Sequence, residues 1–390
     1  MKRIRKFITI AILSLMGLCV VLLAFSALGN LTLPNHSASV EILSAADKTR
    51  LAETRHLLRK LGDEVWPDWG QTDIPKIVYN EEYAFLVGYP NPPDGWVKVP
   101  AGIRRGGGWE PVTDDTFMGE QYYRQRLAGI TPEAFTVMVG EHWVCSLPAF
   151  DWMQISLTQN IRDDLPSFLK PVFPYRLFIN QLVSGDDQYI SLNIHECFHA
   201  YQGRLASEKL AAAENANIQY ESQYPWENEA LQADWKTELE LLADALRMTD
   251  PDQRLELARR FLEVRAARRV SAGLSPELVA YEQKREWLEG LARYAELEIW
   301  RLASTNGYLA VPETGDLPQF ENYRRFEQRW TNELAQIPRM AGDVGDGRFY
   351  YSGMAQAYLL DRLLSDWKST AFDENIWLDD LLQTVVQGME

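Results

Sequence analysis

Cysteine and histidine are scarce in this chain of 390 residues, which contains three of the former and five of the latter. Cys19 lies in an apolar run near the N-terminus, so Cys145 and Cys197 are the one pair in the rest of the chain. These two could form a disulfide in an oxidising compartment or remain two buried thiols, and the sequence leaves both possibilities open. With so few histidines, any regularly spaced pair of them is informative.

Positive charge is also in short supply. The net charge is −16, and it becomes −20 when the four basic residues within the first six positions are removed. A body this acidic repels nucleic acid and anionic lipid, so we expect no nucleic-acid partner. The glycine run at 106–108 lacks the Lys-Ser/Thr pair of a phosphate-binding loop and is predicted to be a flexible loop. We find no internal repeat.

One long uncharged run, Phe7 to Gly29, follows those basic residues. As a helix its 23 residues would be about 34 Å long, enough to cross the core of a bilayer. This length favours a signal anchor over a cleaved signal peptide, although cleavage near residues 27–29 stays open. The basic end should remain in the cytoplasm, which would place residues 30–390 outside it.

The most informative pattern is His195-Glu196-Cys197-Phe198-His199, which spells H-E-x-x-H. Residues four apart share one face of a helix, so the two imidazoles can bind one metal ion while the glutamate faces a bound water. The flanking sequence is typical of an amphipathic helix, with Gln202 in the sector of the histidines and an apolar stripe opposite. That stripe consists of Ile194, Cys197, Phe198, Tyr201 and Leu205. Residues 187–192 are predicted to form a turn and a short strand before the helix.

This segment resembles the active-site helix of the HExxH zinc metallopeptidases, the zincins. The resemblance implies that His195 and His199 bind zinc and that Glu196 is the general base. A catalytic zinc usually has three protein ligands and one position for water. No histidine follows His199, and Gln202 and Leu205 stand where the metzincin pattern needs glycine and a third histidine. We therefore expect a downstream carboxylate, as in the gluzincin branch.

Two downstream segments can supply this carboxylate. Residues 286–296 are predicted to form a helix with Glu289 on its polar side, and their E-G-x-A-x-Y pattern resembles the third-ligand helix of several gluzincin-like families. Gly290 costs about 1 kcal/mol relative to alanine inside a helix, and close approach to the zinc helix would explain it. The alternative is Glu240, whose E-x-x-x-D spacing with Asp244 resembles that of thermolysin-like enzymes. We favour Glu289.

Other charged residues of these segments are predicted to lie on solvated helix faces. The acidic ones are Glu286, Glu296 and Glu298. A basic run is interpreted in the same way, and its members are Arg259, Arg260, Arg265, Arg268 and Arg269.

The resemblance implies hydrolysis by a water that zinc activates. Zinc lowers the pKa of a bound water toward neutrality, and Glu196 would accept the proton and pass it to the leaving group. The oxyanion that forms needs a further donor, which must be a tyrosine or an arginine because no histidine lies downstream. We predict Tyr351 for this role, with Tyr350 beside it and Tyr294 as a further candidate.

The predicted fold is α+β and zincin-like. Residues 1–29 would be the signal anchor or signal peptide and residues 30–43 a linker. A mixed part with a small sheet is expected over 44–192, where an edge strand could bind an extended substrate, and a mainly helical part over 193–390.

The favoured function is a zinc metallopeptidase, membrane-anchored or exported, that cleaves a peptide or protein substrate outside the cytoplasm. Glu196 favours catalysis, because a structural site has no use for a base between its histidines. The alternatives are a non-catalytic envelope protein with a structural or vestigial zinc site, and a zinc hydrolase that cleaves a non-peptide amide.

Overall fold

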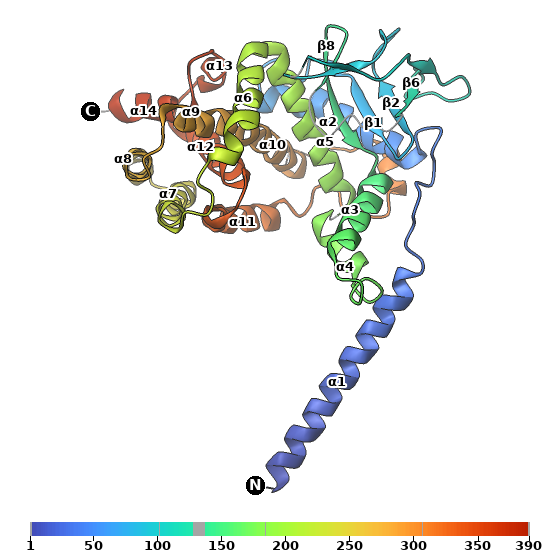
Figure 1. The fold of residues 1–390 in the computed structure, drawn as a ribbon. Helices are drawn as coiled ribbons and strands as arrows, with labels where there is room; N and C mark the ends of the chain where they lie inside the picture. Colours follow the sequence, from blue (N-terminus) through green and yellow to red (C-terminus); the bar gives the residue numbers. More distant parts are fainter. Residues whose placement is uncertain (1, 101, 128–136, 184, 306, 389–390) are drawn as a thin grey trace.

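A curled mixed sheet lies beside a larger helical part (Figure 1). The computed structural model describes residues 2–100, 102–127, 137–183, 185–305 and 307–388. The strands are β1 (Lys76–Tyr79), β2 (Tyr83–Val87), β3 (Trp96–Lys98), β4 (Arg104–Arg105), β5 (Glu110–Pro111), β6 (Tyr123–Arg126), β7 (Val137–Val139) and β8 (His142–Pro148). The predicted α+β class is therefore confirmed.

Helices occupy most of the chain after β8. The α-helices are α1 (Lys2–Asn30), α2 (Ala45–Val65), α3 (Phe150–Asp164), α4 (Tyr175–Leu182), α5 (Asp186–Leu205), α6 (Ser207–Tyr220), α7 (Glu229–Arg247), α8 (Pro251–Ser271), α9 (Pro276–Arg285), α10 (Leu291–Thr305), α11 (Phe326–Gln336), α12 (Gly347–Leu363), α13 (Trp367–Thr370) and α14 (Leu378–Gly388). The short helical turns are η1 (Glu221–Gln223), η2 (Glu286–Gly290), η3 (Pro312–Asp316) and η4 (Ile337–Gly342), of which η2 is a π-helix. The boundary predicted at 192/193 falls within α5.

Within the described ranges the sheet has eight strands in the order β4-β3-β7-β8-β1-β2-β6-β5. Neighbouring strands are antiparallel except β1 and β8, which run parallel with Lys76 opposite Cys145. Successive side chains of a strand point to opposite faces, so β2 contributes to two apolar clusters. Tyr83, Phe85 and Val87 enter one, and Ala84 and Leu86 enter the other. Both faces of the centre of the sheet are therefore buried.

Helix α5 passes between the sheet and the helical part (Figure 1). On its sheet side, Gly203 lies so close to β8 that a Cβ there would come within 2.5 Å of the Trp143 ring. The sulfurs of Cys197 and Cys145 are 3.3 Å apart, and both residues are free thiols in the structure. The predicted apolar stripe is buried except for Leu205, which is exposed at the end of the helix.

The strand predicted at 187–192 does not form, because α5 already begins at Asp186. The carboxylates of Asp186 and Asp187 accept hydrogen bonds from backbone N–H groups of residues 319–323. Acidic side chains in the first turn also stabilise a helix N-terminus. The prediction was therefore wrong because contacts with a distant loop and the helix dipole outweigh the local preference for a strand.

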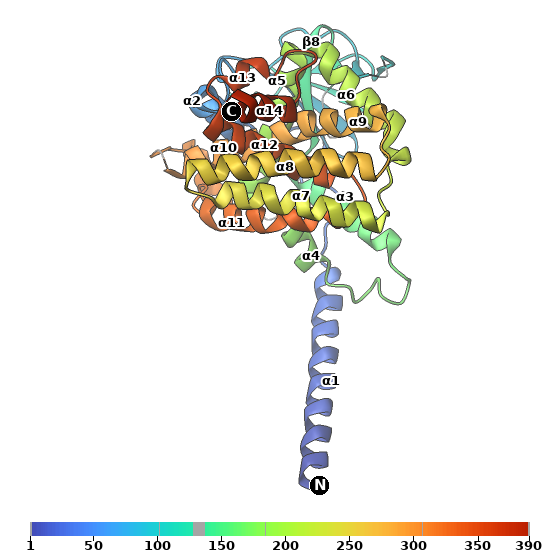
Figure 2. The ribbon, with the colours of Figure 1, turned by 90° about the vertical axis from the view of Figure 1, so that its left-hand side faces the viewer.

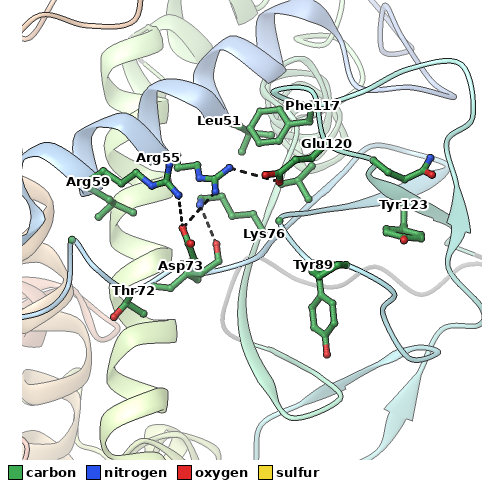
Figure 3. A pocket seen from close by; sticks show the side chains of 17 residues that line it. Leu51, Arg55, Arg59, Thr72, Asp73, Lys76, Tyr89, Phe117, Glu120 and Tyr123 are labelled. Carbon is green, nitrogen blue, oxygen red and sulfur yellow. Dashed lines mark hydrogen bonds and ion pairs between the residues drawn. The ribbon is translucent and has the colours of Figure 1, made fainter.

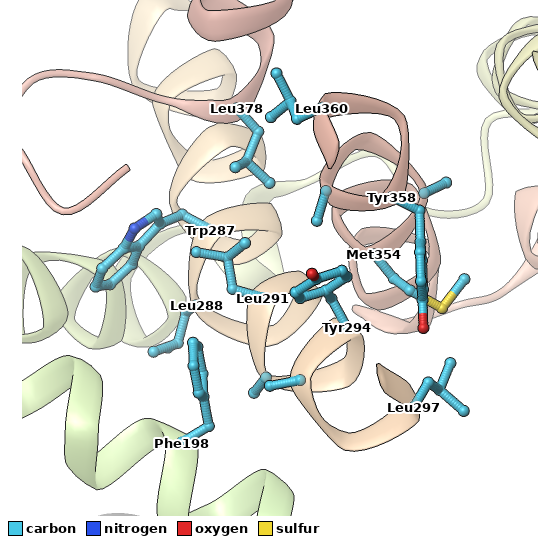
Figure 4. Packing of buried hydrophobic residues seen from close by; sticks show 14 of the residues in the cluster. Phe198, Trp287, Leu288, Leu291, Tyr294, Leu297, Met354, Tyr358, Leu360 and Leu378 are labelled. Atoms are coloured by element: carbon cyan, nitrogen blue, oxygen red, sulfur yellow. The ribbon is translucent and has the colours of Figure 1, made fainter. Parts of the chain in front are cut away.

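The helix predicted over 286–296 does form, as the π-turn η2 followed directly by α10. The close approach at Gly290 is to Gly353 of α12 and not to α5, since a Cβ at position 290 would lie 2.4 Å from the Gly353 Cα. Apolar side chains of α5, η2, α10 and α12 fill the space between these helices (Figure 4). They include Phe198, Leu288, Leu291, Tyr294, Met354 and Tyr358. This packing fixes η2 and α10 against α5.

Several charged side chains predicted to be solvated are buried between helices instead. Arg265 and Arg268 of α8 are each 1% exposed. Arg265 donates to Glu238 at 2.9 Å and to Glu286 at 2.7 Å, and Arg268 donates to Glu238 at 2.7 Å and to Glu282 at 2.6 Å. The prediction failed here because these charges become buried only when α7, α8, α9 and η2 pack together, where each is paired.

Helix α1 projects away from the body (Figures 1 and 2). Residues Leu13–Asn30 are apolar enough, and the helix long enough, to cross a membrane, and none of this window is buried by the rest of the chain. Such a helix could be a membrane anchor or a signal sequence.

Candidate metal centre

Three side chains from two helical segments converge on one point. His195 and His199 lie on α5, and Glu289 lies on η2. The two Nε2 atoms are 3.1 Å apart, and the Glu289 Oε2 is 3.3 Å from the Nε2 of His195 and 3.2 Å from that of His199. Each residue is 6% exposed. These three residues, the metal group, could hold a metal ion, and they are the ligands that the sequence predicts.

Two other candidate residues lie away from the metal group. The Glu240 side chain on α7 is 52% exposed, and its carboxylate is 3.9 Å from Lys236. The Tyr294 hydroxyl donates to Asp361 at 2.5 Å, within the packing between α10 and α12. Of the two candidate carboxylates, Glu289 is therefore the one beside the histidines.

A glutamine decides which nitrogen of His199 carries the proton. The Gln202 amide nitrogen donates to the backbone carbonyls of Trp287 and Leu288 at 2.9 and 3.2 Å. The Gln202 Oε1 must then face the Nδ1 of His199, from which it lies 2.9 Å away. An oxygen can only accept, so the Nδ1 carries a proton, and a neutral imidazole in this tautomer has its lone pair on Nε2. Gln202 also ties α5 to the segment that carries Glu289.

A carboxylate faces the corresponding nitrogen of His195. The Glu296 Oε2 lies 3.6 Å from the Nδ1 of His195, and the glutamate is fully buried, so its predicted place on a solvated face was wrong. Burial raises the pKa of Glu296, but Arg293 and Arg329 outweigh it and hold that pKa well below its usual range. An ionised Glu296 favours a proton on Nδ1. Burial lowers the pKa of His195, but Glu289 and Glu296 outweigh it and raise that pKa above its usual value. The sequence contained a signal for this contact: Glu296 follows Glu289 by about two helical turns, so the two glutamates lie on the same side of the segment.

Glu289, the third member of the metal group, is ionised, as Glu296 is. The Glu289 Oε1 accepts a hydrogen bond from Arg285 at 2.8 Å. Burial raises the pKa of Glu289, but Arg285 and the two histidines hold it well below its usual range. Two nitrogen lone pairs and one carboxylate oxygen in mutual contact repel one another unless a proton or a metal cation lies among them. Two imidazole nitrogens and one carboxylate oxygen form a donor set that suits zinc.

One carboxyl oxygen of Glu196 lies near the metal group without a hydrogen-bond partner among the described residues. This atom, Oε2, is buried. Burial raises the pKa of Glu196 to about 8, the neighbouring Glu289 adds to the shift, and His199 opposes it. Buried polar atoms are nearly always hydrogen-bonded, so this oxygen is available to a water or a substrate.

Of the two neighbouring tyrosines of α12, Tyr350 has its ring against a member of the metal group. The Tyr350 ring stacks on the His195 ring with centroids 5.8 Å apart and an angle of 7° between the planes. Burial and the nearby Glu289 raise the pKa of its hydroxyl well above the usual value, which keeps the hydroxyl protonated. Tyr351, one position further along α12, has its ring 5.8 Å from the Arg293 guanidinium. These contacts do not support the predicted role of Tyr351 as oxyanion donor, because consecutive helix positions differ by about 100° in direction.

A cavity of about 450 Å³ lies elsewhere, between α2 and the sheet (Figure 3). None of the metal group lines it. Its acidic side chains are paired with arginines, with Asp73 lying 3.6 Å from Arg55 and 3.2 Å from Arg59 and Glu120 lying 3.9 Å from Arg55. The candidate site is therefore placed at the metal group.

Comparison of the chain with models of protein families, with curated proteins and with solved structures finds no match.

Proposed function

We propose that this protein is a zinc-dependent metallopeptidase, zincin-like in its site, which α1 anchors in a membrane with the body outside the cytoplasm. His195, His199 and Glu289 would bind the zinc ion (Zn²⁺). The observation that carries the proposal is the convergence of two imidazole nitrogens and one carboxylate oxygen beside Glu196, whose free carboxyl oxygen is what a general base needs. The basic leader supports the proposed orientation.

Four side chains at the site have a role in the proposed hydrolysis: Glu196, Tyr350, Gln202 and Glu296. Zinc bound at this place would make a water acidic enough to be activated near neutral pH and would polarise the substrate carbonyl. Glu196 accepts a proton from the attacking water and returns it to the leaving nitrogen as the C–N bond breaks. The Tyr350 hydroxyl donates to the oxyanion that develops on the carbonyl oxygen. Gln202 and Glu296 hold the imidazoles in their tautomers and orientations.

A purely structural zinc site is the main alternative. Structural sites usually have four protein ligands, whereas the described residues supply three at this place. Catalytic sites keep the fourth position for water, and Glu196 stands beside the three ligands with an unpaired oxygen. Both features favour catalysis.

Metal analysis of purified variants tests the ligand set. The wild-type protein should retain about one zinc per chain after gel filtration, and Glu289→Ala should lose it because two histidines alone bind zinc weakly. Glu240→Ala is the matched control on an exposed helix face and should keep its zinc. A full zinc content in Glu289→Ala together with loss in Glu240→Ala would transfer the ligand role to α7.

A pair of neighbouring substitutions tests the oxyanion donor. Tyr350→Phe should lower kcat by about 10²–10³-fold with little change in KM or zinc content, because the hydroxyl acts in the transition state. Tyr351→Phe removes the same atom from the next position of α12 and should stay near the wild-type rate. The reverse result, with Tyr351→Phe slow and Tyr350→Phe normal, would return the role to Tyr351.

A further inference from the structure

Exposed apolar side chains gather where α1 meets the body. These residues are between 37% and 75% exposed, and they are Phe168, Leu169, Leu177, Phe178 and Leu182. They belong to α4 and to the loop that joins it to α3, and together we name them the α4 patch. Single exposed apolar residues are common on soluble proteins, but five within fifteen positions of one chain segment are a feature that needs an explanation.

Helix α4 has three distinct sides. Tyr175 and Ile179 are buried against the body. At about 100° per residue, Leu177 and Phe178 form a second side, with Gln181 between them, and Leu182 lies at its edge next to Tyr175; all three apolar residues are exposed. Arg176 and Asn180 form a third side that is polar and exposed. A helix with one side on the protein, one apolar side and one polar side suits a boundary between water and an apolar phase.

Hydrogen bonds attach this segment to the end of α1. The Asn30 side chain donates to the carbonyls of Pro171 and Phe173 at 3.0 and 2.9 Å, and Arg176 donates to the Thr32 hydroxyl at 2.7 Å. The apolar window of α1 ends at Asn30. In both views α4 is the part of the body at the end of α1 (Figures 1 and 2). If α1 crosses a bilayer, α4 is therefore held at the level where the membrane meets water.

We propose that the α4 patch lies in the headgroup region of the membrane, with Phe168, Leu177 and Phe178 reaching the ends of the acyl chains. This inference rests on the proposed anchoring by α1. The occupant is a lipid surface, because the patch is continuous with the membrane span. The body is strongly acidic, so the contact is with uncharged or zwitterionic lipid and depends on apolar area rather than on charge.

A second contact with the membrane has a mechanical consequence. A single helix followed by a short chain segment would let the body rotate freely above the bilayer. With α1 and α4 both held, the body keeps one orientation, and the metal group keeps a constant height above the lipid.

Spin labels on the full-length protein in phosphatidylcholine vesicles test the proposal. The first label is placed on Cys19, which is exposed on α1, while Cys145 and Cys197 are fully buried and should not react. The other two labels are placed on Phe178→Cys and on the control Ile218→Cys, each in a Cys19→Ala background. Ile218 is an exposed apolar residue of α6, remote in sequence from the patch.

Collision with oxygen, which is enriched in the bilayer, and with a water-soluble nickel chelate gives the depth of each label. We expect the label at 19 to be deep in the bilayer, the label at 178 to be about 5–10 Å below the headgroup surface, and the label at 218 to be in water. A deep label at 19 with positions 178 and 218 equally accessible to nickel would overturn the α4 patch and leave the anchor intact. Removal of position 19 by cleavage, or its exposure to water, would overturn the anchor. In that case, depth at 178 would still support the patch, and exposure at 178 would overturn both proposals.

Discussion

Replacing Glu196 by glutamine is expected to lower kcat by about 10²–10⁴-fold while zinc stays bound. Glutamine has nearly the shape of glutamate but cannot accept the proton of the attacking water. The metal group does not include Glu196, so metal affinity should change little. The effect is expected to be large because the Oε2 of Glu196 has no hydrogen-bond partner among the described residues and is therefore free to accept this proton.

The measurement needs only a substrate that the wild-type protein cleaves, such as a member of a quenched fluorescent peptide library. Glu240→Gln makes the same chemical change on an exposed face and should retain wild-type kcat. Zinc content measured on the same samples separates loss of the base from loss of the metal. An active Glu196→Gln enzyme with zinc bound would refute the proposed mechanism. A peptide library that is never cleaved, with an amide of another class hydrolysed instead, would favour the non-peptide alternative.

Replacing Arg265 by methionine is expected to reduce the free energy of unfolding by about 3–5 kcal/mol. Arg265 is buried and pairs with Glu238, Glu286 and Asp379. Methionine fills much of the space but leaves these carboxylates without their common partner, and a buried unpaired charge costs more than the pair gains. The pKa of Arg265 supports this view, since burial lowers it but the surrounding carboxylates raise it well above the usual value.

The matched control lies on the same helix. Arg259 is 41% exposed and pairs with Glu256 and Glu263 of its own helix, so Arg259→Met should change the free energy of unfolding by no more than about 0.5 kcal/mol. Denaturant titration of the full chain in detergent, followed by tryptophan fluorescence, compares the two midpoints. If Arg265→Met does not fold, Arg265→Lys keeps the charge without the planar fork and should be intermediate. Equal midpoints for Arg265→Met and Arg259→Met would show that the buried charges do not need Arg265.

The ion pairs of Arg265 also affect the position of the metal group, because Glu286 and Glu289 share the five-residue turn η2. Arg265 and the Ser352 hydroxyl both hydrogen-bond to the Glu286 carboxylate. The charges between α8, α9 and η2 therefore position the backbone that carries the third candidate ligand. Gly290 adds to this by letting the same turn touch α12.

Local pattern was sufficient for several features of this protein. The spacing of His195 and His199, and the apolar stripe beside them, predicted a helix with two imidazoles on one face, and α5 has that form. The apolar run near the N-terminus predicted the projecting helix α1. Helical periodicity also placed Glu289 on the polar side of its segment. Such features depend on residues within a few turns of one another, and the sequence lists those neighbours directly.

The sequence alone therefore predicted a metal site with two histidines and one carboxylate, and it predicted the helix that carries the histidines. Only the tertiary structure decided between Glu289 and Glu240, brought Glu296 against His195, placed Tyr350 beside the metal group and buried Arg265. A helical pattern tells which side chains share a face, but it does not tell whether that face meets water or another helix. That depends on packing between elements far apart in the chain, such as α5 and η2, where His195 and Glu289 are 94 positions apart. This packing sets burial, charge pairing and the convergence of ligands.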